Sequence, residues 1–170
     1  MKLLRFGEAG VEKPGIMDTN GTIRDLSSVL TDIAGDALSD EGITRIAAID
    51  PTTLPSVDAD TRLGPCVAGT GKFICIGLNY ADHAAEAGLD LPPEPVIFMK
   101  ATSAICGPND PIVIPRGSTK TDWEVELAVV IGKRAKYVTQ AEAMDYIAGF
   151  AITNDVSERS FQNERAGQWT

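Results

Sequence analysis

The chain has 170 residues, of which 44% are hydrophobic and 23% charged, and these proportions fit a globular protein rather than a disordered chain or a coiled coil. Its 24 Asp and Glu residues outnumber its 15 Lys and Arg residues, which gives a formal net charge of -9 at pH 7. This charge would repel a nucleic acid or an anionic membrane, and the small basic group Lys133, Arg134 and Lys136 does not offset it, so neither partner is expected.

The three cysteines, Cys66, Cys75 and Cys106, are odd in number and have no Cys-x-x-Cys spacing. They therefore predict reduced thiols rather than a disulfide framework or a zinc knuckle. The first residues lack the apolar segment of a secretory signal, and no run approaches the roughly 20 apolar residues that span a bilayer. We expect a cytoplasmic protein.

Residues 1–65 are predicted to form a small β-rich amino-terminal domain. Residues 2–6 have the pattern of a first strand, and Asn20-Gly21 is the dipeptide most typical of a tight hairpin turn. Weak helical patterns follow at residues 26–33 and 41–49. Residues 51–65 contain several prolines and are predicted to be a linker.

Residues 66–170 are predicted to form a second domain of mixed α/β, mainly β, structure. Short apolar runs predict strands at 73–77, 96–99, 112–114, 123–131 and 150–153. An alanine-rich segment predicts a helix at 80–88, which Gly88 would end. Thr139 and Glu142 form a capping-box pattern, so a short helix should run to about Tyr146, and residues 156–166 are predicted to be helical.

A pair of glutamates, Glu124 and Glu126, lies within the strand expected at 123–131. Side chains alternate across a strand, so both carboxylates should point to the same face, with α-carbons about 6.5–7 Å apart. Asp155 follows the next apolar strand and could complete an all-oxygen set. Three carboxylates without clustered His or Cys favour Mg²⁺ or Mn²⁺, with Ca²⁺ as a further candidate. The alternative is that both glutamates face water on a half-exposed sheet.

His83 is the single histidine, and Glu86 lies three residues later on the helix expected there. A carboxylate at this spacing could orient the imidazole and raise its basicity, as activation of a water molecule requires. The alternative is a half-buried histidine with a surface ion-pair partner.

Arg159 and Gln162 also lie three residues apart, just after Asp155. A guanidinium beside a metal could bind a substrate carboxylate through two hydrogen bonds. Because Glu158, Glu164 and Arg165 make this segment generally charged, a solvated helix face is the alternative.

Several segments together resemble the fumarylacetoacetate hydrolase family. The segments 76–86 (IGLNYADHAAE) and 95–100 (PVIFMK) resemble the entry to its catalytic domain, 122–132 (DWEVELAVVIG) resembles its metal strand, and 146–159 (YIAGFAITNDVSER) resembles its third-ligand segment. The resemblance covers the chain from about residue 70, and the first part resembles the variable amino-terminal domain of bacterial members.

The resemblance implies a β-sandwich or roll, a Mg²⁺ or Mn²⁺ site and usually a homodimer. By position, Glu124, Glu126 and Asp155 resemble the metal ligands, and His83 with Glu86 resembles the water-activating pair. The residues that resemble substrate contacts are Arg159, Gln162, Tyr80 and Lys100. A lysine that the family has shortly after the position of Thr170, and roughly another hundred residues, are absent from this sequence.

The resulting hypothesis is metal-assisted hydrolysis of a carbon–carbon bond in a small β-dicarbonyl acid, such as an acylpyruvate or a 2,4-dioxo acid. Decarboxylation, isomerisation and ureidoglycolate-type lyase chemistry are alternatives within the same family. A non-catalytic metal-binding fragment or interaction subunit is an alternative from another class.

Overall fold

The structure is a computed structural model that describes residues 1–165 and 167, and it is mainly β with a few short helices. The chain divides into two compact units. Unit 1 contains residues 1–69, 106–113 and 123–155, and unit 2 contains residues 70–105, 114–122 and the chain from 156 onward. The domain boundary predicted near residue 65 remains a prediction. Among the described residues, no helix has the length and apolar character needed to cross a bilayer.

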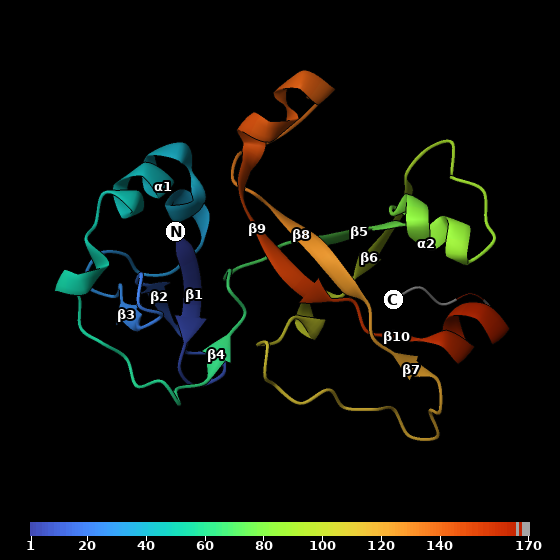
Figure 1. Cartoon of the computed structure of the whole chain (residues 1–170), viewed down its shortest axis with the longest axis horizontal. Helices are drawn as coiled ribbons and strands as arrows, with labels where there is room; N and C mark the ends of the chain where they lie inside the picture. The colour runs from blue at the N-terminus through green and yellow to red at the C-terminus, as the bar shows by residue number, and fades with distance from the viewer. Residues whose placement is uncertain (166, 168–170) are drawn as a thin grey trace. The chain divides into compact units, whose positions relative to one another are not determined.

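The amino-terminal part of unit 1 is a four-stranded antiparallel sheet with the strand order β3-β2-β1-β4 (Figure 1). Its strands are β1 (Lys2–Phe6), β2 (Lys13–Met17), β3 (Ile23–Asp25) and β4 (Leu63–Gly64). The predicted turn at Asn20-Gly21 is confirmed. Gly21 adopts a positive φ of 83°, which a glycine reaches without the steric cost of a side chain, and Asp18 bonds the amides of Asn20 and Thr22 at 2.9 Å each.

Helix α1 (Asp40–Ala47) covers the core of this sheet and confirms the helical pattern predicted at residues 41–49. Ser39 begins it by accepting a hydrogen bond from the Gly42 amide at 3.1 Å. Leu26, Ile33 and Ile46 are almost completely buried here. Two 3₁₀ helices flank α1 at Gly35–Leu38 and Pro51–Thr53.

The helix predicted at residues 26–33 is wrong, because this segment consists of turns. Polar side chains at its two ends bind the backbone instead of leaving it to a helix. Asp25 accepts the Ser27 amide at 2.7 Å, and Asp32 accepts the Ile33 amide at 2.8 Å while also pairing with Arg5. Leu26, Leu30 and Ile33 are thus buried by turns, while Val29 is exposed.

Unit 2 contains the antiparallel pair β5 (Phe73–Gly77) and β6 (Val96–Lys100), which confirms the strands predicted at 73–77 and 96–99 (Figure 1). Helix α2 (Ala81–Glu86) lies between them in sequence. It ends two residues before Gly88, whose φ of 67° is typical of a residue after a helix. A 3₁₀ helix follows β6 at Thr102–Ala104.

The antiparallel hairpin of β8 (Val125–Ile131) and β9 (Ile147–Asn154) belongs to unit 1 (Figure 1). The segment between the strands contains a 3₁₀ helix, Gln140–Tyr146, and confirms the predicted capping pattern: the Thr139 amide and hydroxyl donate to Glu142 at 3.2 and 2.6 Å. One face of the hairpin is apolar and exposed, with Leu127 at 58% and Ile152 at 83% exposure.

The segments before β8 and after β9 depart from the sequence prediction. Residues 112–114 do not form the predicted strand, because Pro111 and Pro115 enclose them and remove two amide donors from any ladder. The helix predicted at 156–166 is also wrong. Its first residues form β10 (Ser157–Glu158), which pairs with β7 (Thr121–Asp122), and a π-helix follows at Ser160–Glu164. Residue 166 lies outside the described residues.

Candidate functional site

The end of the β8–β9 hairpin brings the three predicted metal ligands to one place on the backbone. Val125 is opposite Asn154 and Glu126 is opposite Thr153 in the register. The Asp155 amide donates to the Glu124 carbonyl at 2.9 Å, so the pairing extends one step beyond the strands and places Asp155 opposite Glu124. Opposed residues in an antiparallel pair share a face. Glu124, Glu126 and Asp155 therefore share one face of the hairpin.

The burial pattern supports this shared face. Residues 124, 126, 128 and 130 are half-buried, whereas residues 125, 127, 129 and 131 are exposed. An all-carboxylate donor set on one face fits a hard divalent cation such as Mg²⁺ or Mn²⁺. However, no group of three or more His, Cys, Asp or Glu side chains within residues 1–165 and 167 is arranged to hold a metal ion. The backbone fits the assignment, while the side chains are not gathered around one point, so the ligand set remains a prediction.

His83 and Glu86 both lie on the short helix α2 and both are exposed. Their i, i+3 spacing places them on neighbouring positions of one side of the helix. In the part of the chain that the structure describes, no hydrogen bond or ion pair joins the two side chains. The His83 amide is bonded by Asp82 at 2.9 Å, which fixes the first turn of the helix. The catalytic pairing of His83 with Glu86 remains a prediction.

Arg159 and Gln162 are brought into direct contact at the start of the π-helix. The Arg159 Nη1 group donates to Gln162 Oε1 at 2.8 Å, while Nε and Nη2 both lie 3.0 Å from Asp122 Oδ2. The Arg159 amide also donates to the Lys120 carbonyl at 2.9 Å. The guanidinium is thus held by two different side chains. Asp122 was not a predicted site residue, and no local spacing indicates it because it lies 37 positions from Arg159.

The other two predicted substrate contacts lie at the ends of unit 2 elements. Lys100 is the last residue of β6, and its ammonium group donates to the Val156 carbonyl at 2.9 Å. It therefore binds the same segment that carries Arg159. Tyr80 occupies the position before α2 and is 41% exposed. The roles of Lys100 and Tyr80 in binding a substrate remain predictions.

Glu158 does not belong to a solvated helix face, which was one interpretation of this segment. Its carboxylate accepts hydrogen bonds from the hydroxyls of Ser118, Thr121 and Ser160, with Thr121 at 2.8 Å and Ser160 at 2.9 Å. These bonds, the one from Ser118 foremost, lower the pKa of Glu158 from 4.5 to about 2 against the opposing effect of desolvation. Sequence reasoning missed this contact because Ser118 lies 40 positions away.

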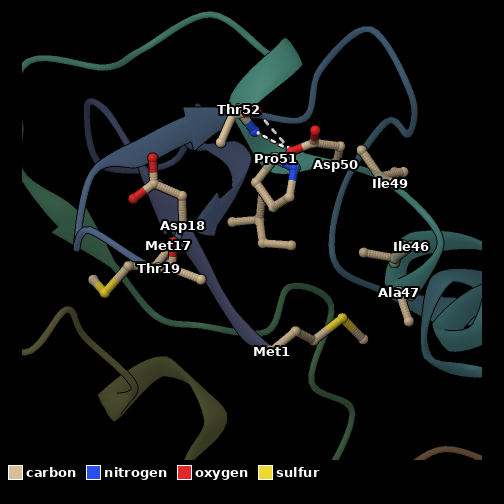
Figure 2. A pocket seen from close by; sticks show the side chains of 11 residues that line it. Met1, Met17, Asp18, Thr19, Ile46, Ala47, Ile49, Asp50, Pro51 and Thr52 are labelled. Carbon is tan, nitrogen blue, oxygen red and sulfur yellow. Dashed lines mark hydrogen bonds between the residues drawn. The ribbon is translucent and has the colours of Figure 1, made fainter.

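A hollow of about 280 Å³ lies in the amino-terminal part of unit 1, between α1 and the β2–β3 turn (Figure 2). Its walls are mainly apolar. Asp18 and Asp50 also line it, but both carboxylates already have partners: Asp18 accepts hydrogen bonds from the Asn20 and Thr22 amides and from Arg24, and Asp50 from Thr52. None of the predicted site residues lines this hollow, and it contributes no part of the candidate site.

The chain is similar to proteins of one family along most of its length. Residues 72–170 match the family model described as fumarylacetoacetate (FAA) hydrolase C-terminal. A Burkholderia ambifaria protein that is named only as a candidate hydrolase is 66% identical over 169 residues, which are 99% of this chain and 60% of that protein. A similarly named Burkholderia orbicola protein is 64% identical with the same coverage. The chain thus spans about 60% of the length of these relatives.

Solved structures have the same fold. A fumarylacetoacetate hydrolase from Exiguobacterium antarcticum has a TM-score of 0.73 and 31% identity, covering 96% of this chain and 58% of that one. A 2-hydroxyhepta-2,4-diene-1,7-dioate isomerase from Mycobacterium marinum has a TM-score of 0.69 and 32% identity, covering 100% and 59%. A maleylpyruvate hydrolase from Sphingobium, solved with manganese(II) and pyruvate, has a TM-score of 0.72 at 23% identity, covers 98% and 63%, and supports the fold alone.

Proposed function

Because this chain belongs to the fumarylacetoacetate hydrolase family, we propose that it carries part of a divalent-metal-dependent hydrolase that cleaves a carbon–carbon bond in a small β-dicarbonyl acid. The observation that supports this most is the register of the β8–β9 hairpin, which aligns three carboxylates on one face. The names of the similar proteins, which include hydrolases and an isomerase, support the general class of reaction.

In this proposal Glu124, Glu126 and Asp155 hold Mg²⁺ or Mn²⁺. A bound ion of this kind supplies a Lewis acid that polarises the substrate oxygens. The three carboxylates bring negative charge to one place, which a divalent cation would compensate. Their role is to fix the position of the ion relative to the substrate.

His83 takes a proton from a water molecule, and Glu86 orients the imidazole for this transfer. The hydroxide bonds to the carbonyl carbon distal to the substrate's acid group. The adjoining carbon–carbon bond then breaks, and its electron pair stays with the 2-oxo acid fragment, which gains a proton. Arg159, held by Asp122 and Gln162, binds the substrate carboxylate, and Lys100 and Tyr80 contribute to the same binding surface.

Two alternatives are supported by particular observations. Isomerisation, decarboxylation or lyase chemistry would use the same metal without a water nucleophile, and a similar solved structure is named as an isomerase. Product analysis on a panel of 2-oxo acids separates these reactions. A non-catalytic interaction subunit would fit the exposed apolar face of β8–β9, and the whole protein would then form a homodimer or a complex with another chain.

The test of the metal site is a thermal melt with and without millimolar Mn²⁺ for the unmutated chain and Glu126→Ala. Ligand a hundredfold above its dissociation constant stabilises the folded state by about 2.7 kcal/mol, or about 5–10 °C for a chain of this size. We expect this shift in the unmutated chain and in a control variant, Glu8→Ala, whose carboxylate is exposed in the same unit. An equal shift in Glu126→Ala, or none in the unmutated chain, would contradict the metal assignment.

A further inference from the structure

Glu158 connects two segments of unit 2 that are far apart in sequence. One of its carboxylate oxygens, Oε2, accepts hydrogen bonds from the hydroxyls of Ser118 and Thr121, which also contact each other at 2.7 Å. The other oxygen, Oε1, accepts the hydroxyl of Ser160 at 2.9 Å and its amide at 3.3 Å. Both oxygens are therefore bonded, one toward residues 118–121 and one toward the π-helix.

This double attachment coincides with the backbone pairing that carries Arg159. Glu158 lies opposite Thr121 and Ser157 lies opposite Asp122 in the β7–β10 register. The Glu158–Thr121 side-chain bond therefore reinforces a backbone pair only two residues long. The next residue is Arg159, whose amide continues the contact by donating to the Lys120 carbonyl.

Glu158 and the neighbouring Arg159 guanidinium have different hydrogen-bond partners. Glu158 receives hydroxyl and amide hydrogens, whereas Arg159 bonds to Asp122 and Gln162. Charged hydrogen bonds of this kind are stronger than neutral ones. Because the pKa of Glu158 is lowered to about 2, chiefly by Ser118, its carboxylate stays ionised across the physiological range.

We propose that Glu158 is a positioning residue, whose hydrogen bonds to Ser118, Thr121 and Ser160 hold the β7–β10 pair together and thereby place the Arg159 guanidinium beside Asp122 for binding the carboxylate of a 2-oxo acid. The ligand named here rests on the proposed function, whereas the placement of Arg159 does not.

The chain offers a matched control for this proposal. Lys120 and Glu164 form an ion pair that joins the same two segments, but both side chains are about half exposed. An exposed pair of this kind contributes little to stability. Glu164→Gln therefore removes one carboxylate from the π-helix that follows Glu158 without affecting the Glu158 hydrogen bonds.

The direct test is the Arg159 Nε–H signal in ¹H–¹⁵N NMR spectra of the 170-residue chain, assigned by its loss in Arg159→Lys. The Nε–H group donates to Asp122 at 3.0 Å, so its exchange with water should be slower than that of an arginine without this bond. We expect Glu158→Ala and Ser118→Ala to move this signal to the position of a freely exposed arginine. Glu164→Gln should leave it unchanged, and Glu158→Gln should largely restore it because an amide can bond to the same hydroxyls.

The second readout uses a 2-oxo acid substrate with the Mn²⁺-loaded chain. Glu158→Ala should raise KM at least tenfold with kcat within threefold, and Glu158→Gln should recover most of the loss. The proposal would be overturned if Glu158→Ala and Ser118→Ala both lowered the melting temperature but left the Arg159 signal unchanged. Glu158 would then have only a structural role. The NMR signal decides the placement of Arg159 whether or not this chain, which spans about 60% of the length of its relatives, turns over a substrate.

Discussion

One substitution made at two positions tests how this chain distributes its buried surface. Ile46 on α1 is 0% exposed, whereas Ile152 on β9 is 83% exposed. Changing isoleucine to alanine removes three carbon atoms. At about 0.8 kcal/mol for each buried carbon group, burial of these atoms stabilises the folded state by about 2.4 kcal/mol. The cavity left in a rigid core raises the cost, so Ile46→Ala should lower the free energy of unfolding by about 2.4–5 kcal/mol.

Ile152→Ala removes the same atoms from a side chain that is already in contact with water. A surface substitution usually costs within about 0.5 kcal/mol, and the lower strand preference of alanine adds at most about 1 kcal/mol. Urea unfolding followed by far-ultraviolet circular dichroism measures both variants. With a slope of about 2 kcal/mol per molar urea, Ile46→Ala should shift the midpoint by about 1.2–2.5 M and Ile152→Ala by less than about 0.8 M.

The slope of each unfolding curve serves as the control, because it should be the same for both variants and the unmutated chain. A midpoint shift for Ile152→Ala as large as that for Ile46→Ala would refute the reasoning. The β8–β9 face would then be covered in solution, and sedimentation velocity at several protein concentrations would show whether a second copy of the chain covers it.

Three further predictions test other parts of the molecule. Arg62 lowers the pKa of Asp110 and of Glu12 through its hydrogen bonds. These two carboxylates therefore stabilise the folded state at pH values above their unfolded pKa values of about 3.8 and 4.5. The stabilisation is lost as the pH falls through their lower folded pKa values. In Arg62→Ala the melting temperature should therefore change less between pH 6 and pH 3 than in the unmutated chain, and an equal acid dependence would contradict the assignment. Gly42→Ala should destabilise α1 although alanine favours helices, because the new Cβ would lie 2.7 Å from the Ala37 carbonyl oxygen. Gly149→Ala in β9 should be tolerated, because its Cβ would meet no atom within 4 Å. Thermal melts of the two variants compare these effects directly. In the whole hydrolase of which we propose this chain is a part, His83→Gln should reduce kcat by at least a hundredfold while the Mn²⁺-induced rise in melting temperature remains, and unchanged turnover would remove His83 from the mechanism.

The ion-pair network around Arg62 shows a feature that no sequence pattern indicates. Arg62 lies within the segment predicted to be a linker and binds Asp110, 48 positions later, through two hydrogen bonds, and it also binds Glu12, 50 positions earlier. Glu12 in turn lies 3.4 Å from Arg5, which pairs with Asp32. Each of these residues looks like an ordinary surface charge in the sequence, because the partners are far apart along the chain. Only the folded sheet brings them together.

The sequence by itself determined the features that depend on neighbouring residues. The Asn20-Gly21 turn, the strands β5, β6, β8 and β9, and the bonds between Thr139 and Glu142 all follow from local conformational preferences and hydrogen bonds. The shared face of Glu124 and Glu126 likewise follows from the period of two residues in a strand, which needs no information about distant parts of the chain.

The tertiary structure decided the features that depend on distant pairing. The position of Asp155 opposite Glu124 follows from the β8–β9 register, which is set by a ladder between strands separated by a 3₁₀ helix. The segment after Asp155 has a helical pattern, yet its start forms β10 because Thr121 and Ser118 offer Glu158 backbone and side-chain partners across 37 and 40 positions. Local preference is worth only tenths of a kcal/mol per residue, so a few long-range hydrogen bonds can override it.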